Sequence, residues 1–196
     1  MFKNFAILVI SVKMPKPHLI TEFLHDPKVA SVKPSSKFIS KFICKKIDFN
    51  KNITIVEYGP GTGALTKELL KNINTNSRII VVENNPKFAL FLNKVNDFRL
   101  VVVSDSAENI ESILSRLNVE KVDYFISGIP FSMIKKDVKN KIIEKTEEML
   151  ADGGYFFVYQ FRKNIEKDLR KHFFKIKRHY EIRNIPPLVI FECKKS

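Results

Sequence analysis

The sequence predicts an α/β fold with a mostly parallel sheet, and three observations support this prediction. From about residue 53 onward, short apolar runs rich in β-branched residues alternate with segments of helical period, the pattern of successive βα units. The runs are continuously apolar, as strands buried on both faces of a parallel sheet are. A glycine-rich stretch follows the first run and opens the first helix, at the position where open α/β sheets bind ligands.

Composition limits the class of protein. The 196 residues, 44% of them hydrophobic, suffice for one domain with a buried core. A mean hydropathy of −0.11, with no apolar run near the ~20 residues that cross a bilayer, excludes a polytopic membrane protein. The net charge of +13 is concentrated in residues 1–52 and 162–196. Such basic flanks attract polyanions, and nucleic acid and an anionic membrane surface are equal candidates at this point.

Four strands and four crossover helices make up the predicted βα units. The strands are expected at 53–57, 78–83, 99–103 and 122–126. The helices, whose apolar residues recur three or four positions apart, are expected at 65–73, 86–95, 108–117 and 135–150.

The C-terminal part completes a seven-stranded sheet. A turn signal at 152–154 precedes a strand at 155–161 and a basic helix at 164–172. Two further strands follow, at 174–183 and 188–193. Because the connection between these two strands is short and contains two prolines, we expect an antiparallel hairpin.

The N-terminal residues 1–50 are predicted to form a basic amphipathic helical segment that precedes a domain at 51–196. Ser35 or Ser36 can cap a helix at 37–47, and an earlier short helix is expected at 17–25. The helix at 37–47 gathers apolar side chains on one side and lysines on the other. It is either a core-packing helix with a solvated lysine face or an element whose lysines face phosphates of lipid or RNA.

Two cysteines, Cys44 and Cys193, have no C-x-x-C partner, so neither a disulfide framework nor a zinc site is predicted. A reducing cytoplasm is the expected compartment. The apolar segment 5–10 is short for a signal peptide, and we expect a short docking segment rather than an export signal. Met14 offers an alternative start, so the sequence leaves open whether residues 1–13 are native.

The stretch from Val56 to Thr66, V-E-Y-G-P-G-T-G-A-L-T, carries the strongest chemical signal. Glycines allow the backbone to approach a ligand where a β-carbon would clash. No lysine follows Gly63 as a phosphate-binding loop requires, and the third glycine of a dinucleotide fingerprint is absent. The stretch resembles the first motif of class I S-adenosylmethionine-dependent methyltransferases, E-x-G-x-G-x-G. The resemblance implies a Rossmann-like sheet with helices on both faces and S-adenosylmethionine as the cofactor.

The residues at the ends of the later predicted strands also match motifs of that family, in the same order along the chain. The resemblance implies that Glu83 accepts hydrogen bonds from the ribose hydroxyls and that Asp105 contacts the adenine amine. The implied cofactor contacts are Glu57, Gly59, Pro60, Gly61, Thr62, Gly63, Glu83, Asn84, Asp105, Ser106, Ala107, Ser127 and Gly128. The implied acceptor contacts are Ile129, Pro130, Phe131 and Arg162.

Two methyltransferase families have motifs similar to these: the ribosomal RNA adenine dimethyltransferases and the bacterial phospholipid N-methyltransferases. Position 128, where the RNA family has Asn or Asp to hold the adenine amine, is glycine here. Only some 35 residues follow Phe161, too few for the helical RNA-binding domain of that family. The basic amphipathic segment before Pro34-Ser35-Ser36 and the closing Asn184–Pro187 are also similar to the lipid family. We therefore expect an enzyme that methylates an aminolipid such as phosphatidylethanolamine, with an RNA adenine methyltransferase as the alternative.

Methyl transfer from a sulfonium to an amine requires positioning rather than a metal or a protein nucleophile. No general base is identified, and Tyr159 is the best-placed side chain for that role. The expected partners are a phospholipid head group and an anionic membrane surface, with peripheral attachment in the cytoplasm and nucleic acid only under the alternative. A protein that binds the cofactor without turnover and acts as an adaptor is a third possibility. The acceptor lipid, the number of methyl groups and the oligomeric state stay open.

Overall fold

The computed structural model describes residues 37–161, 164–184 and 186–196. The predicted segment 5–10, the helix at 17–25, the caps Ser35 and Ser36 and the acceptor contact Arg162 lie outside the described residues. In the described part of the chain, no helix is long and apolar enough to cross a membrane. The same part brings no three His, Cys, Asp or Glu side chains together in an arrangement that could hold a metal ion.

The described residues form one seven-stranded sheet in the order β3-β2-β1-β4-β5-β7-β6. The strands are β1 (Thr54–Tyr58), β2 (Arg78–Val82), β3 (Leu100–Val103), β4 (Val122–Ser127), β5 (Leu150–Gln160), β6 (Lys175–Glu181) and β7 (Leu188–Lys194). The first five pair in parallel, whereas β7 runs antiparallel to both β5 and β6. The predicted mostly parallel sheet with a C-terminal antiparallel hairpin is confirmed.

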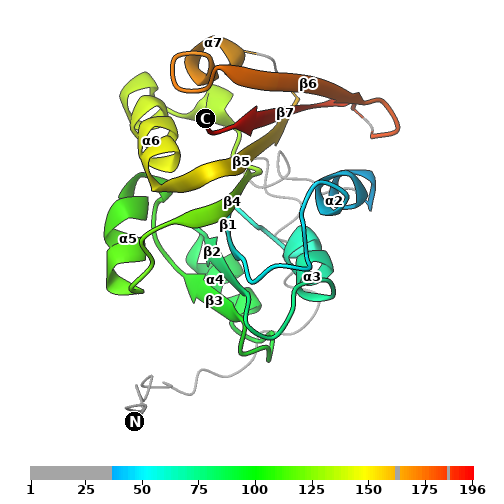
Figure 1. Ribbon diagram of the computed structural model, residues 1–196, viewed down its shortest axis with the longest axis vertical. Coiled ribbons are helices and arrows are strands. Elements are labelled where there is room, and N and C mark those ends of the chain that lie inside the picture. The colour runs from blue at the N-terminus through cyan, green and yellow to red at the C-terminus, as the bar shows by residue number, and fades with distance from the viewer. Residues whose placement is uncertain (1–36, 162–163, 185) are drawn as a thin grey trace. The chain divides into compact units, whose positions relative to one another are not determined.

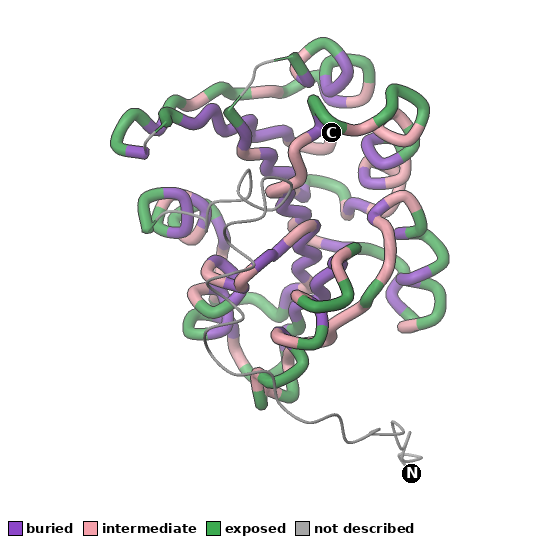
Figure 2. The backbone as a smooth tube through the Cα atoms, turned by 180° about the vertical axis from the view of Figure 1, so that it is seen from behind, coloured by how far each residue is buried: buried purple, intermediate pink, exposed green. Residues whose placement is uncertain are grey.

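Helices cover both faces of the sheet, as Figure 1 shows. They are α2 (Lys37–Cys44), α3 (Ala64–Leu70), α4 (Pro86–Leu92), α5 (Ile110–Arg116), α6 (Lys136–Met149) and α7 (Glu166–Leu169), with short 3-10 turns η1 (Ala107–Asn109) and η2 (Phe131–Met133). One core cluster joins the sheet to α5, α6 and α7, and the other joins it to α2, α3 and α4. Purple strands between green outer helix faces mark these two cores in Figure 2.

Helix α2 contributes Ile39 and Ile43, both fully buried, to the second cluster. Lys37 and Lys41 on the helix, and Lys45 directly after it, remain exposed. The helix therefore packs on the core and presents a solvated lysine face at the same time. It ends at Cys44, three residues before the predicted end.

The larger differences from the prediction lie in β5 and α7. The signal at 152–154 is no turn before a strand but part of β5, where the pairing with β4 shifts register between Val122 and Tyr124. Gly153 has a φ of +74° there, so the glycine pair accommodates an irregularity inside a strand. The predicted helix at 164–172 is only the four-residue α7, because its ends form turns rather than regular helix.

The topology sets the position of the site. The chain crosses from β1 outward to β2 and β3 and then returns to the other side of β1 as β4. The carboxyl ends of β1 and β4 therefore lie at the switch point of the sheet, where open α/β folds bind ligands.

Candidate active site

The loop after β1 holds three glycines in the left-handed backbone region. The φ angle is +63° at Gly59, +56° at Gly61 and +71° at Gly63. Residues with a β-carbon rarely adopt this region, so the glycines are what permits the tight path of the loop. The Gly63 N–H donates to the Pro60 carbonyl over 2.9 Å, and α3 begins at the next residue.

Glu57 is the buried acidic group of the site. Its side chain is inaccessible to solvent, and the Thr66 hydroxyl donates to Oε2 over 2.6 Å. The other oxygen, Oε1, is buried without a hydrogen-bond partner among the described residues. Burial raises the pKa of Glu57 to about 7, against the lowering effect of the Thr66 bond and with a further rise from the charge of Glu83.

Glu83, at the end of β2, ties the glycine loop to the neighbouring strand. Its Oε2 accepts from the Gly61 N–H over 3.1 Å, and its Oε1 accepts from the Asn85 N–H over 2.8 Å. Burial raises the pKa of Glu83, although backbone N–H groups donating to it act in the opposite direction. Each carboxylate oxygen retains lone-pair capacity for a further donor. The neighbouring Asn84 is exposed.

Asp105 follows β3 and is already engaged in several bonds. Its Oδ1 accepts from the Asn109 side-chain amide over 2.8 Å and from the Ser106 N–H over 2.7 Å. Its Oδ2 accepts from Arg116 over 3.2 Å. These donors, the Asn109 amide first, lower the pKa of Asp105. Asp105 thus holds the turn that leads into α5, and Ala107 packs into the core beside it.

The chain after β4 combines buried and half-buried residues. Ser127 is inaccessible to solvent, and its hydroxyl accepts from the Ile129 N–H over 3.3 Å. Gly128, Ile129 and Pro130 are partly accessible. Phe131, in contrast, is only 2% exposed and packs into the core cluster on the α5 and α6 side.

The loops after β1 and β4 lie against each other. The Gly128 N–H donates to the Tyr58 carbonyl over 3.1 Å. A β-carbon built on Gly59 would lie 3.3 Å from Cγ1 of Ile129. The structure therefore brings the glycine loop next to the predicted acceptor loop, although some 70 residues separate them in the chain.

Tyr159, from the adjacent strand β5, covers Gly128. A β-carbon built on Gly128 would lie 2.5 Å from the Tyr159 hydroxyl oxygen and 2.9 Å from Cζ of the ring. Real β-carbons do not approach other atoms this closely, so glycine is required at 128 as long as Tyr159 keeps this position. The side chain that the sequence indicated as best placed is therefore at the acceptor loop.

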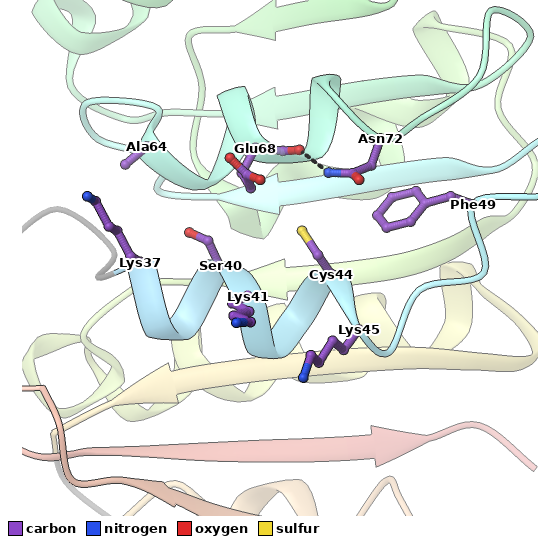
Figure 3. Close-up of a pocket in the computed structure, with 9 residues that line it drawn as sticks. All are labelled: Lys37, Ser40, Lys41, Cys44, Lys45, Phe49, Ala64, Glu68 and Asn72. Carbon is purple, nitrogen blue, oxygen red and sulfur yellow. Dashed lines mark hydrogen bonds between the residues drawn. The ribbon is translucent and has the colours of Figure 1, made fainter.

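A groove of about 610 Å³ runs between α2 and α3 (Figure 3). Its lining comprises Lys37, Ser40, Lys41, Cys44, Lys45, Phe49, Ala64, Glu68 and Asn72. Ser40 and Cys44 point from α2 toward α3 in this view, and the Asn72 amide donates to the Glu68 carbonyl over 2.7 Å. Because Ala64 directly follows Gly63, one end of the groove adjoins the glycine loop.

Two groups of polar residues could not be assigned a role from the sequence motifs. Thr66, the donor to Glu57, stands inside the glycine-rich stretch, so its position in the motif was the available signal. The sequence around His179 contains no motif that signals a role. In the structure His179 bonds Glu192 over 2.9 Å, and Lys46 reaches the same carboxylate over 2.9 Å. This cluster joins the residues just after α2 to the β6–β7 hairpin.

The residues fit a cofactor that carries both a cationic group and hydroxyls. A buried carboxylate oxygen without a partner, as on Glu57, favours a cationic or N–H donor. Glu83 lies one strand further along with acceptor capacity left on both oxygens. Together with the strand order and the glycine loop, these features define a class I S-adenosylmethionine-dependent methyltransferase.

The chain belongs to the ribosomal RNA adenine dimethylase family, whose sequence model matches residues 18–127. It is also 28% identical over 181 residues to an ornithine lipid N-methyltransferase of Singulisphaera acidiphila, a match that covers 88% of this chain and 91% of the relative.

Solved methyltransferases share the fold. The N-methyltransferase NodS from Bradyrhizobium japonicum, in complex with S-adenosyl-L-homocysteine, has a TM-score of 0.67 at 11% identity, covering 91% of this chain and 97% of NodS. The 16S rRNA N2 methyltransferase RsmC from T. thermophilus, in complex with AdoMet and guanosine, has a TM-score of 0.65 at 18% identity. That match covers 87% of this chain and 45% of RsmC. The family match, together with the glycine loop and Glu83 at the carboxyl ends of β1 and β2, makes S-adenosylmethionine the cofactor of this enzyme.

Proposed function

We propose that this enzyme methylates the amine head group of a membrane lipid, with phosphatidylethanolamine and ornithine lipid as the two head groups to test. One observation carries the proposal. Position 128 has no side chain, and the Tyr159 phenol occupies the space that one would need. The acceptor loop therefore lacks a side-chain amide or carboxylate at 128 to hold the exocyclic amine of a planar base.

A lipid acceptor is also supported by how much of the chain each similarity covers. The match to the ribosomal RNA adenine dimethylase family ends at residue 127, directly before Gly128 and the rest of the acceptor loop. The similarity to the ornithine lipid N-methyltransferase extends over 88% of the chain.

In the proposed reaction the protein mainly positions the reactants. Bound S-adenosylmethionine supplies a methyl group on a positively charged sulfur. Glu57, Glu83 and the glycine loop would hold this donor, while Ser127–Pro130 and Tyr159 would line the acceptor side. The lone pair of the acceptor nitrogen forms the N–C bond, the electrons of the broken S–C bond stay on sulfur, and the proton released by the nitrogen passes to water.

The lysine face of α2 supports peripheral attachment to an anionic membrane. Lys37, Lys41 and Lys45 are exposed along the groove between α2 and α3. Lysines near an anionic leaflet contribute attraction that salt weakens. Attachment of this kind would bring lipid head groups to the enzyme without a membrane-spanning segment.

The test is methyl transfer from labelled S-adenosylmethionine to vesicles that contain phosphatidylethanolamine or ornithine lipid in an anionic background. We expect a labelled lipid after extraction and thin-layer chromatography. Its position on the chromatogram gives the number of methyl groups added. Vesicles without an aminolipid serve as the control. Cofactor binding without any labelled lipid contradicts the proposal.

The second candidate is an RNA adenine methyltransferase, which the family match over 18–127 and the charge of +13 favour. The same labelled donor is therefore offered to ribosomal RNA in a parallel reaction. Label in RNA and none in lipid would establish this alternative. Tight cofactor binding with no product on either acceptor would instead indicate an adaptor protein.

A further inference from the structure

Tyr159 is the last residue but one of β5, beside the acceptor loop. Ser127 of β4 pairs with Val158 of β5, so the next residues along the two strands, Gly128 and Tyr159, are neighbours at the carboxyl edge. The hydroxyl lies so close to Gly128 that no β-carbon fits between them. Since Gly128 also donates to the carbonyl at the end of β1, this hydroxyl lies at the switch point of the sheet.

The Tyr159 side chain is partly buried against one of the two core clusters. One face of β5 carries three aromatic residues at alternate positions, Tyr155, Phe157 and Tyr159. All three pack in the core cluster that includes α2 and α3. The rings of Tyr155 and Phe157 stack with centroids 5.9 Å apart, and Tyr124 stacks on Tyr155 at 6.2 Å. Glu57 packs toward α3 on the same face, where its carboxylate meets Thr66.

We infer that the Tyr159 hydroxyl accepts a hydrogen bond from an N–H of the acceptor amine, and that Gly128 is glycine to give this hydroxyl its place. The inference rests on the proposed lipid acceptor and deepens it, because it names the residue that orients the nitrogen. An amine N–H bound to the phenol oxygen points the nitrogen lone pair elsewhere, toward the methyl donor. A phenol oxygen has acceptor capacity in addition to its one O–H donor, so it can accept from an N–H of a primary amine.

This role makes a prediction that a packing role does not. Each methyl transfer removes one N–H from the nitrogen, so the hydroxyl has fewer donors to accept from at each successive step. Loss of the hydroxyl should therefore slow the first transfer most and transfer to a dimethylated head group least. A ring that only fills space would affect all three transfers equally.

The experiment compares wild type with Tyr159→Phe, which keeps the ring and removes only the hydroxyl. Tyr155→Phe is the matched control, because it removes a phenol hydroxyl from the same face of β5 four residues earlier. Initial rates are measured on vesicles with unmethylated, monomethylated and dimethylated phosphatidylethanolamine. We expect kcat/KM of Tyr159→Phe to fall by about tenfold on the unmethylated lipid and by less on the dimethylated lipid, with unchanged affinity for S-adenosylhomocysteine.

Gly128→Ala gives a second, independent test. Its β-carbon should displace the Tyr159 ring, so Gly128→Ala should lose activity on the unmethylated lipid, while the double variant with Tyr159→Leu should be no worse than Tyr159→Leu alone. Wild-type rates in Tyr159→Phe, or equal losses on all three lipids, would overturn the inference and leave the lipid acceptor intact. A wild-type enzyme that methylates no lipid would overturn both.

Discussion

The two halves of the site use different chemistry. At the ends of β1 and β2, the polar groups are two carboxylates, Glu57 and Glu83, both removed from solvent and both with a raised pKa. At the ends of β4 and β5, Gly128 offers only backbone and Tyr159 offers a neutral phenol. Buried carboxylates favour a cationic ligand that is held tightly.

The two halves also differ in how much of each the family match covers. The family match covers the β1 and β2 ends and stops at residue 127. The residues that lie beyond this limit, Gly128 and Tyr159, form the close contact of the acceptor loop. Five predictions test this division of the site and the lysine surface that lies outside it.

The largest effect is expected from Gly61→Val. A β-branched residue is strained at a φ of +56°, and the shifted loop would lose the bond from the Gly61 N–H to Glu83. We expect affinity for S-adenosylmethionine to fall by at least about 100-fold in calorimetry. Gly153→Val carries similar backbone strain at a φ of +74° in open space within β5, so it should lose stability and keep cofactor affinity. Equal loss of binding in both variants would show that the effect is general unfolding.

Glu83→Ala should weaken cofactor binding by about 10- to 100-fold, because the Gly61 and Asn85 N–H groups lose their acceptor and the cofactor loses its own. Glu83→Gln keeps one acceptor oxygen and should lie between this variant and wild type. The KM for lipid, measured at saturating cofactor, should stay within twofold in both. A change in lipid KM as large as the change in cofactor affinity would contradict the separation of the two halves.

The pH dependence of cofactor binding tests Glu57. With a pKa of about 7, its carboxylate is mostly protonated at pH 6 and mostly ionised at pH 7.5. If binding requires the ionised form, affinity should rise roughly eightfold over this interval in wild type and stay flat in Glu57→Gln. Titration calorimetry at several pH values measures this.

The stability of the cofactor-free protein should depend on pH in the opposite direction to cofactor affinity. Because folding raises the pKa of Glu57, the folded state binds a proton more tightly than the unfolded state does. Ionising Glu57 therefore costs stability progressively as pH rises from its ordinary pKa of 4.5 through about 7. Glu57→Gln should melt at a higher temperature than wild type at pH 8 and at a similar one at pH 4.5. A variant that is less stable at pH 8 would contradict the raised pKa.

The smallest effect concerns the lysine face of α2, which lies outside both halves. Lys41→Gln should weaken binding to anionic vesicles about fivefold at low salt, and the difference should shrink as salt is added. Lys167→Gln, at an equally exposed lysine of α7 on the other side of the sheet, removes the same charge and should bind like wild type. Flotation of vesicles with bound protein measures both. Equal losses would show that net charge rather than α2 governs attachment.

The sequence was sufficient to predict the fold class and to propose residues for the cofactor half of the site. Alternation of β-branched runs with helical periods is a local pattern, and it predicted seven strands and the antiparallel hairpin in order. The glycine-rich loop and the acidic strand ends are short motifs too. Because parallel strands place their carboxyl ends at one edge, knowing the strands was enough to bring Glu57, Gly61 and Glu83 together.

Tertiary structure alone decided the rest, because these contacts depend on register and packing between residues far apart in the chain. The sequence shows that residue 128 is glycine and has no side chain. Only the pairing of β4 with β5 shows that Tyr159 occupies the space that a side chain at 128 would need. Likewise, only the fold joins His179 and Lys46 through Glu192. A register shift inside β5 absorbed the glycines that predicted a turn. Local patterns define elements, whereas the contacts that select an acceptor arise where the elements meet.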